Sequence, residues 1–173
     1  VSPHRPLLAT NRPERHGGFF SGTEDARLEI LREAVHKGAE WVDLEEDVAE
    51  EVCREFQRYG ARLVCSHHDY SQTPDRDKLR RKAEELAAMG ADCIKVVTLA
   101  TSPDDNLRVL ELVPFGRDQL GVDVIAFCMG PLGRWSRMVC LLLGSPWTYV
   151  QLPGQGQAAP GQLTASEIRA LWE

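Results

Sequence analysis

The sequence CIKVVTL at residues 93–99 is followed closely by SPDDNLRVLELV at residues 102–113. The first stretch is apolar and rich in β-branched residues apart from one lysine, which predicts a buried strand. The second begins with Ser102 as a helix cap and Pro103 in the first turn, and its apolar residues recur at helical spacing. A buried strand followed by an amphipathic helix is the unit from which parallel sheets are built.

The same unit recurs on both sides of this stretch. An amphipathic helix follows each of the predicted strands, and the helix after the fifth strand runs from about 134 to 143. The strands are predicted at residues 7–10, 41–44, 62–66, 93–99, 122–129 and 147–152. A doubly wound sheet usually carries a glycine-rich phosphate-binding turn after its first strand, and this sequence has none there. We therefore predict an α/β protein of the (β/α)8 TIM-barrel type.

The length of the chain predicts an incomplete barrel. The chain has 173 residues, whereas eight βα units typically need about 250. We expect residues 1–173 to form a single partial TIM-barrel domain, truncated to about six βα units because the first two are absent. Such a truncation would leave an open sheet edge, which allows association into a homodimer.

The composition is that of an ordinary globular domain, with 43% hydrophobic and 27% charged residues. The net charge of −6 argues against a nucleic-acid or anionic-membrane partner, since both favour a basic face. The five cysteines are odd in number and lie mostly in apolar runs, as expected for reduced thiols. No apolar stretch has the length of a membrane span and no signal-peptide pattern opens the chain, so we predict a cytoplasmic protein.

Polar side chains cluster near the carboxyl ends of the predicted strands, where barrel enzymes place their active residues. They are Arg12, Asp43, Glu45, His68, Lys95 and Arg137. Lys95 is the most informative, because desolvation in an apolar strand lowers the pKa of an amine, and a neutral amine can form an imine with a carbonyl substrate. A lysine on an edge strand that reaches solvent is the alternative, and the strand pattern alone leaves both open.

Two histidines, His67 and His68, follow the third strand and alternate between its faces. A metal site built from them and Asp69 is therefore not expected. One imidazole beside an imine-forming lysine would suit proton transfer next to a carbonyl, although a lone histidine at a strand end is more often a hydrogen-bonded packing residue. Asp43 and Glu45 share a strand face, and we expect them to pair with cations or to orient other side chains rather than to form a glycosidase pair.

The motifs at these strand ends, taken together, resemble the type I 3-dehydroquinate dehydratases over essentially the whole chain. The motifs are Thr10-Asn11-Arg12 with Gly17-Gly18, Asp43-Leu44-Glu45, Ser66-His67-His68-Asp69-Tyr70 with Thr73-Pro74, Asp92-Cys93-Ile94-Lys95-Val96, Met129-Gly130 with Gly133 and Ser136-Arg137, and Ala159-Pro160-Gly161-Gln162. The resemblance implies a lyase of the shikimate pathway, which leads to chorismate and the aromatic amino acids. Such an enzyme converts the small molecule 3-dehydroquinate to 3-dehydroshikimate and water, needs no metal and no organic cofactor, and in some relatives is fused to a shikimate dehydrogenase.

The same resemblance implies roles for individual residues. Lys95 would form a Schiff base with the substrate ketone, and His68 would be the general acid and base. The residues expected to bind the substrate are Arg12, Arg137, Gln162 and Met129, with Arg137 as the bidentate partner of the substrate carboxylate. The glycine-rich loop at residues 154–162 would form a lid over the barrel mouth, although an ordinary connecting loop has the same composition. The residues expected in that lid are Ala158, Ala159, Pro160 and Gly161.

Two residues depart from the family pattern. His16 stands where the family has a glutamate that orients the catalytic histidine, and Ala158 stands where a serine often begins the lid motif. His16, Glu45 and Asp43 are therefore expected to be orienting or structural residues. Two other interpretations stay open. One is a non-catalytic fragment or degenerate homologue of the same family, and the other is a different Schiff-base barrel enzyme such as an aldolase.

Overall fold

The structure is a computed structural model that describes residues 5–152, 154 and 161–172. The strands are β1 (Leu8–Thr10), β2 (Trp41–Glu45), β3 (Arg62–Asp69), β4 (Cys93–Leu99), β5 (Asp123–Met129), β6 (Val150–Gln151) and β7 (Leu163–Thr164). The α-helices are α1 (Glu24–His36), α2 (Glu50–Arg58), α3 (Arg76–Ala88), α4 (Pro103–Leu110), α5 (Leu112–Phe115), α6 (Ser136–Leu142) and α7 (Ala165–Trp172). Single short helical turns complete the chain as η1 (Glu14–His16), η2 (Gly116–Leu120) and η3 (Pro131–Gly133).

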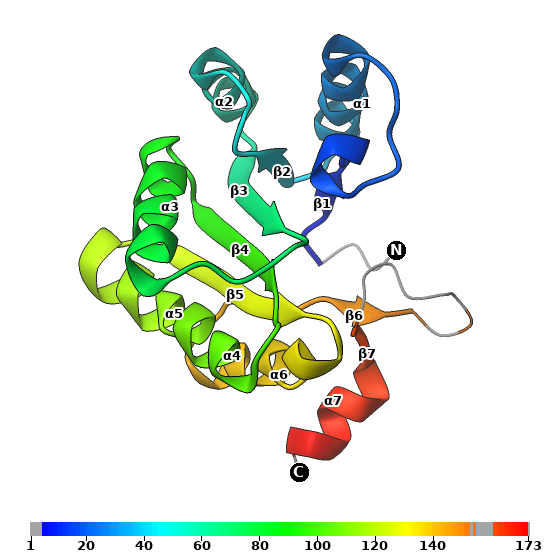
Figure 1. Cartoon of the computed structure of the whole chain (residues 1–173). Helices are drawn as coiled ribbons and strands as arrows, with labels where there is room; N and C mark the ends of the chain where they lie inside the picture. The colour runs from blue at the N-terminus through cyan, green and yellow to red at the C-terminus, as the bar shows by residue number, and fades with distance from the viewer. Residues whose placement is uncertain (1–4, 153, 155–160, 173) are drawn as a thin grey trace.

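One parallel sheet organises the molecule, with the strand order β1-β2-β3-β4-β5. Each neighbouring pair of strands is joined by a helical crossover, and Figure 1 shows the helices ranged around the outside of the curved sheet. Parallel strands that are covered on both faces are apolar along most of their length. Residues of the sheet therefore supply most of the buried core. Val42, Leu63, Ile94 and Ile125 are each 0% exposed.

Three of the helices begin at capping residues. The hydroxyl of Thr23 accepts a hydrogen bond from the Ala26 backbone N–H at the start of α1, and Asp75 accepts one from Lys78 at the start of α3. Ser102 begins α4 with a capping box. The predicted helix at 103–113 is divided at Glu111 into α4 and α5. The proline at position 114 has no backbone N–H to donate back to α4, which explains the break.

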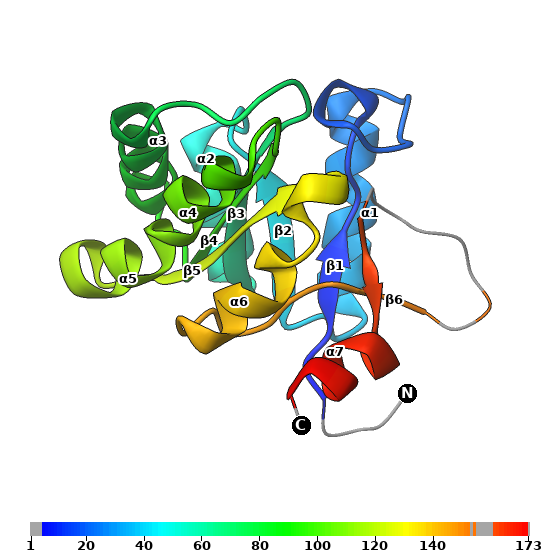
Figure 2. The ribbon, with the colours of Figure 1, turned by 60° about the horizontal axis from the view of Figure 1, so that its bottom comes forward.

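The sixth predicted strand, at residues 147–152, is much shorter than expected. It is reduced to β6, which pairs in parallel with β7 and does not join the main sheet. The residues before β6 are instead held by side-chain packing, since the ring of Trp147 meets Trp41 edge-on with centroids 5.2 Å apart. In Figures 1 and 2 the segment after α6 crosses from the β5 side of the sheet towards β1, where β6, β7 and α7 lie.

The third strand is longer than predicted. Its pairing with β4 continues through His67, His68 and Asp69, whereas the sequence pattern ended it at Ser66. His68 is thereby fixed on a strand rather than on a loop. Within the described ranges, every helix is too short or too polar to cross a bilayer.

Candidate active site

A cavity of about 560 Å³ opens at the carboxyl ends of the strands. The strand register explains which side chains meet there, because Glu45 lies opposite Ser66 and Ser66 lies opposite Lys95. Parallel neighbours in register point their side chains to the same face of the sheet, so these three residues form one row. Of the predicted site residues, the cavity is lined by Arg12, His68, Lys95, Met129, Arg137 and Gln162.

Asp43 lies at the centre of the polar contacts below the cavity. Its Oδ2 is 2.8 Å from Arg12 Nη2 and 3.2 Å from Lys95 Nζ, and its Oδ1 accepts a hydrogen bond from the Ser66 hydroxyl. Burial on its own would raise the pKa of Asp43, but Lys95 and Arg12 more than offset this and hold it well below its usual value. The sequence-based expectation that Asp43 pairs with cations is confirmed.

Lys95 is buried and faces the cavity, so the edge-strand alternative is wrong. Burial is the largest influence on its pKa and lowers it, Asp43 opposes that effect, and the positive charge of Arg12 adds to it. The net result is a pKa below the ordinary lysine value. The ring of Tyr149 covers the amine, with Nζ 4.4 Å from the ring centroid.

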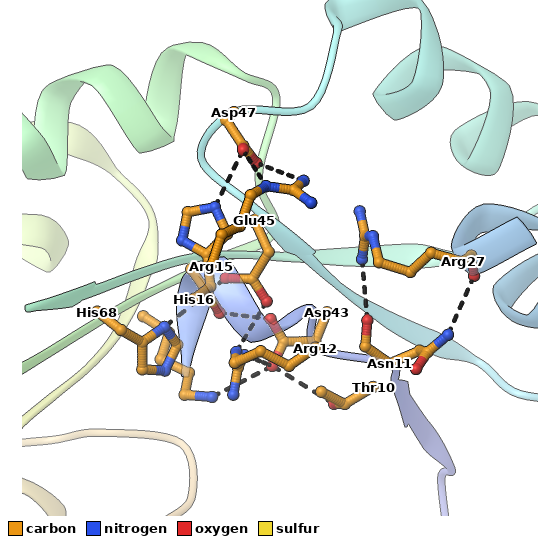
Figure 3. A network of polar contacts seen from close by, with 12 residues as sticks. Thr10, Asn11, Arg12, Arg15, His16, Arg27, Asp43, Glu45, Asp47 and His68 are labelled. Carbon is orange, nitrogen blue, oxygen red and sulfur yellow. Dashed lines mark hydrogen bonds and ion pairs between the residues drawn. The ribbon is translucent and has the colours of Figure 1, made fainter. Parts of the chain in front are cut away.

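Arg12 joins the two carboxylates of β2. Its Nη2 contacts Asp43 and its Nε lies 2.8 Å from Glu45 Oε1, as Figure 3 shows. The loop after Arg12 folds back closely on it, since a Cβ on Gly18 would lie only 2.0 Å from the Arg12 carbonyl oxygen. Glycine is needed there for a steric reason, and this accounts for the Gly-Gly pair of the motif.

His68 is held between two residues. Its Nδ1 is 3.7 Å from Glu45 Oε2, and its ring stacks loosely on Tyr70 with centroids 6.1 Å apart. Burial is the largest influence on the pKa of His68 and lowers it to about 4, although the carboxylate of Glu45 acts in the opposite direction. The ring is therefore neutral at physiological pH.

His16 does not contact the site in the manner of an orienting residue. Its Nε2 lies 3.0 Å from Asp47 Oδ2, and the same carboxylate is held by Arg15. Figure 3 shows the ring of His16 directed at Asp47 on the outer side of the network. His16 thus belongs to an ion-pair cluster that ties the loop after β1 to the end of β2.

Three of the predicted substrate-binding residues, Arg137, Met129 and Gln162, line the cavity. Arg137 is 1% exposed, and its guanidinium carbon lies 4.4 Å from the ring centroid of Phe127. Burial lowers the pKa of Arg137 to about 10, which still leaves a cation at neutral pH. Met129 and Gln162 line the same cavity and are 2% and 7% exposed. A buried cation beside neutral side chains suits a small anion.

The predicted lid can be placed only in part. Ala158, Ala159 and Pro160 lie outside the described residues. Gly161 has a φ of 77°, and a Cβ there would approach the Gly130 carbonyl oxygen to 2.8 Å, so the segment passes close to the end of β5. Gly161 is the residue that brings Gln162 to the cavity wall.

Sequence reasoning missed the aromatic residues of the site. Tyr149, Phe127 and Tyr70 all line the cavity, yet none was predicted to do so. The signal for Phe127 was its place in an apolar strand, which is equally typical of a core residue. Tyr149 precedes β6, whose short length the sequence pattern did not indicate.

Among the described residues, no group of three or more His, Cys, Asp or Glu side chains could hold a metal ion.

Comparison with known proteins identifies the family. The sequence model of type I 3-dehydroquinase matches residues 1–173. The 3-dehydroquinate dehydratase of Syntrophobacter fumaroxidans is 53% identical over 168 residues, which cover 97% of this chain and 72% of that protein. The 3-dehydroquinate dehydratase of Thermococcus gammatolerans is 38% identical, over 99% of this chain and 79% of that protein.

Solved structures agree. The 3-dehydroquinate dehydratase of Geobacillus kaustophilus superimposes with a TM-score of 0.86 at 31% identity, over 96% of this chain and 66% of that chain. A protein of S. pombe that holds a dehydroquinate dehydratase and a shikimate dehydrogenase gives a TM-score of 0.84 at 28% identity, over 99% of this chain and 33% of that one. These relatives are TIM barrels, which confirms the predicted fold class. The chain belongs to the type I 3-dehydroquinase family.

Proposed function

We propose that this chain is a 3-dehydroquinate dehydratase, a hydro-lyase that works through an imine on Lys95. The observation that carries the proposal is a buried amine with a lowered pKa that faces a cavity of small-molecule size. A neutral amine attacks a ketone, and desolvation is the usual means by which a protein supplies one. The names of the relatives supply the substrate and the reaction type.

The first half of the reaction activates the substrate. The free amine of Lys95 adds to the ketone carbon, and loss of water gives an iminium ion. The iminium withdraws electrons and makes the neighbouring C–H acidic. Neutral His68 takes that proton as a general base, which leaves an enamine. Both residues line the same cavity, as this step requires.

The second half expels water. The electron pair of the enamine re-forms the iminium as the β-hydroxyl leaves, and protonated His68 returns its proton to that leaving group. Water then adds to the iminium, releases 3-dehydroshikimate and frees the amine of Lys95. Asp43 offsets the positive charge on the lysine nitrogen in the iminium stages, since its Oδ2 already lies 3.2 Å from Nζ.

We assign substrate binding to other side chains that line the cavity. Arg137 is proposed to bind the substrate carboxylate, and Arg12, Gln162 and Met129 to line the ring and hydroxyl positions. The lid role of the segment with Ala158 also remains a proposal. No metal or organic cofactor takes part in this scheme, because the lysine activates the ketone itself.

The cellular compartment, the domain organisation and the oligomeric state of the enzyme are also proposals. The five cysteines are free thiols, which supports a reducing compartment such as the cytoplasm. We propose that residues 1–173 fold as a single domain. We also propose that the chain forms a homodimer, which light scattering would detect as twice the chain mass. The S. pombe relative shows that a dehydratase of this type can be fused to a shikimate dehydrogenase.

Turnover tests the proposal directly. The product is a conjugated enone, so its ultraviolet absorbance should rise when the chain is mixed with 3-dehydroquinate. Lys95→Met keeps the buried volume but removes the amine, and we expect turnover to fall to background. His68→Asn should reduce turnover by about 10²–10⁴-fold. Lys37→Met is the matched control, because Lys37 is exposed on the outside of the barrel. A folded wild-type chain without turnover would instead support the non-catalytic interpretation.

A further inference from the structure

The carboxylate that faces His68 in this chain comes from β2. Glu45 is 0% exposed and its two oxygens have different partners. Oε1 accepts the hydrogen bond from Arg12 Nε at 2.8 Å, whereas Oε2 is buried without a hydrogen bond. Nδ1 of His68 is likewise buried without a hydrogen bond, and these two atoms lie 3.7 Å apart.

This separation is longer than a hydrogen bond but short enough to become one. Buried polar atoms are nearly always paired, because an unpaired one costs about 1–3 kcal/mol. Catalytic hydrogen bonds are often long in a ligand-free site and tighten when the substrate binds. Oε2 and Nδ1 each need a partner of the kind that the other provides, since a carboxylate accepts and an imidazole N–H donates.

The other candidates for this role are already engaged. Asp43 is occupied by Lys95, Arg12 and Ser66. Asp47 is occupied by Arg15 and His16 on the outer side of the network. Figure 3 shows Glu45 between Arg12 and His68, with Asp47 beyond it.

We infer that Glu45 is the positioning residue of His68 in this chain and that His16 has no part in orienting the imidazole. Glu45 holds the imidazole proton on Nδ1, which leaves the lone pair on Nε2 as the base that removes the substrate proton. Arg12 fixes the carboxylate from the other side, so Glu45 cannot turn away. This inference rests on the proposed function, because it assigns a tautomer to the proposed base.

The charges around the ring are consistent with a neutral imidazole whose tautomer is fixed. Glu45 and Asp43 face it from β2, Lys95 from β4 and Arg12 from the loop after β1. Tyr70 stacks on one ring face. The opposite charges partly offset each other, and burial keeps the pKa of His68 at about 4. The ring is therefore neutral at neutral pH and carries a single proton, whose position on Nδ1 or Nε2 can be observed.

Glu45→Gln is the sharpest test. Arg12 donates to the Oε1 position and therefore selects the amide oxygen, which turns the amide NH2 towards His68. An NH2 group donates to Nδ1 and favours the proton on Nε2, which is the wrong tautomer for a base in the cavity. We expect kcat to fall by about 10²–10⁴-fold, while the yield of the borohydride-trapped imine on Lys95 changes little.

The tautomer itself is measured by ¹⁵N NMR of histidine-labelled protein at neutral pH, without substrate. Wild type should show His68 protonated on Nδ1, and Glu45→Gln should show it protonated on Nε2. His16→Ala is the control and should leave both the tautomer and kcat unchanged. A wild-type signal with the proton on Nε2, or a tautomer that moves in His16→Ala, would overturn the inference.

The outcomes separate the two proposals. If wild type has no turnover, the proposed function fails, but the NMR signal still decides the role of Glu45. If wild type is active and Glu45→Gln is equally active with an unchanged tautomer, only the inference about Glu45 fails. If Glu45→Gln does not fold, the tautomer of His68 in the wild-type and His16→Ala spectra still tests the inference.

Discussion

Asp43 compensates the buried ammonium of Lys95 and the partly buried guanidinium of Arg12, and that single carboxylate explains much of the electrostatics of the site. Lys95 and Arg12 both contact its Oδ2, so each cation is partly neutralised without losing its place at the cavity. Burial of an unpaired charge lowers the free energy of unfolding, and these contacts reduce that penalty. The amine keeps a lowered pKa because the effect of burial exceeds that of its counter-charge.

The buried imidazole of His68 should make stability depend on pH. Its pKa is lowered to about 4 in the folded chain, chiefly by burial, whereas an unfolded histidine titrates near 6.5. Between these values the unfolded chain binds more protons, so stability falls as the pH drops. We expect the free energy of unfolding to be about 2 kcal/mol lower at pH 5 than at pH 7.

Urea denaturation of wild type and His68→Gln at both pH values measures this contribution. The variant should lose most of the difference, because a glutamine does not titrate. An equally large pH dependence in His68→Gln would mean that other groups cause it and that the ring of His68 is not buried in its neutral form.

At the scale of elements, the loop between β1 and α1 positions Arg12. Gly18 packs against the Arg12 backbone, and the Phe20 backbone N–H donates to the same Arg12 carbonyl at 3.2 Å. A methyl group at position 18 must push this backbone away. We expect Gly18→Ala to displace the guanidinium by a fraction of an ångström or more and to lower kcat/KM by about 10²-fold.

Gly60→Ala is the matched control for this loop. A Cβ at Gly60 meets no atom within 4 Å, although its φ of 81° makes alanine strained. It should cost about 1 kcal/mol of stability and leave kcat/KM of the folded enzyme unchanged. Normal kcat/KM in Gly18→Ala would show that the loop does not set the position of Arg12.

The elements also show how far the sequence could predict the structure. The bounds of β4 were predicted correctly, because a long apolar run with a capped helix after it is unambiguous. The prediction for β3 stopped early, since the polar residues His67 and His68 gave no apolar signal although their backbone pairs with β4. The length of β6 was overestimated, because the apolar residues before β6 take part in aromatic packing and not in strand pairing.

The site could be predicted as a list of residues but not as a network. Strand-end position and the family motifs brought Lys95, His68 and Arg12 together. The contact of His16 with Asp47 depends on how the loop after β1 folds back on the end of β2. The contact of Glu45 with His68 depends on the register of β2 and β3 beyond the end of the predicted strand. That geometry arises from long-range packing, which local patterns do not encode.

At the scale of the whole molecule, all five cysteines report on the integrity of the core. They are buried free thiols, and the list is Cys53, Cys65, Cys93, Cys128 and Cys140. Within the described residues, β5 pairs only with β4, so Cys128 lies on an edge strand of the sheet and is still 0% exposed. We expect iodoacetamide to label none of the five within minutes in the native chain and all five in urea. Rapid native labelling of Cys128 would show that the open sheet does not keep its edge packed.

The proposed mechanism depends on a covalent bond between the buried amine of Lys95 and the substrate ketone. It is tested most directly by adding borohydride to the chain in the presence of 3-dehydroquinate and mapping the modified peptide by mass spectrometry. We expect a reduced, substrate-sized adduct on Lys95 and no adduct in Lys95→Met. An adduct on a different lysine, or turnover by wild type without any adduct, would contradict it.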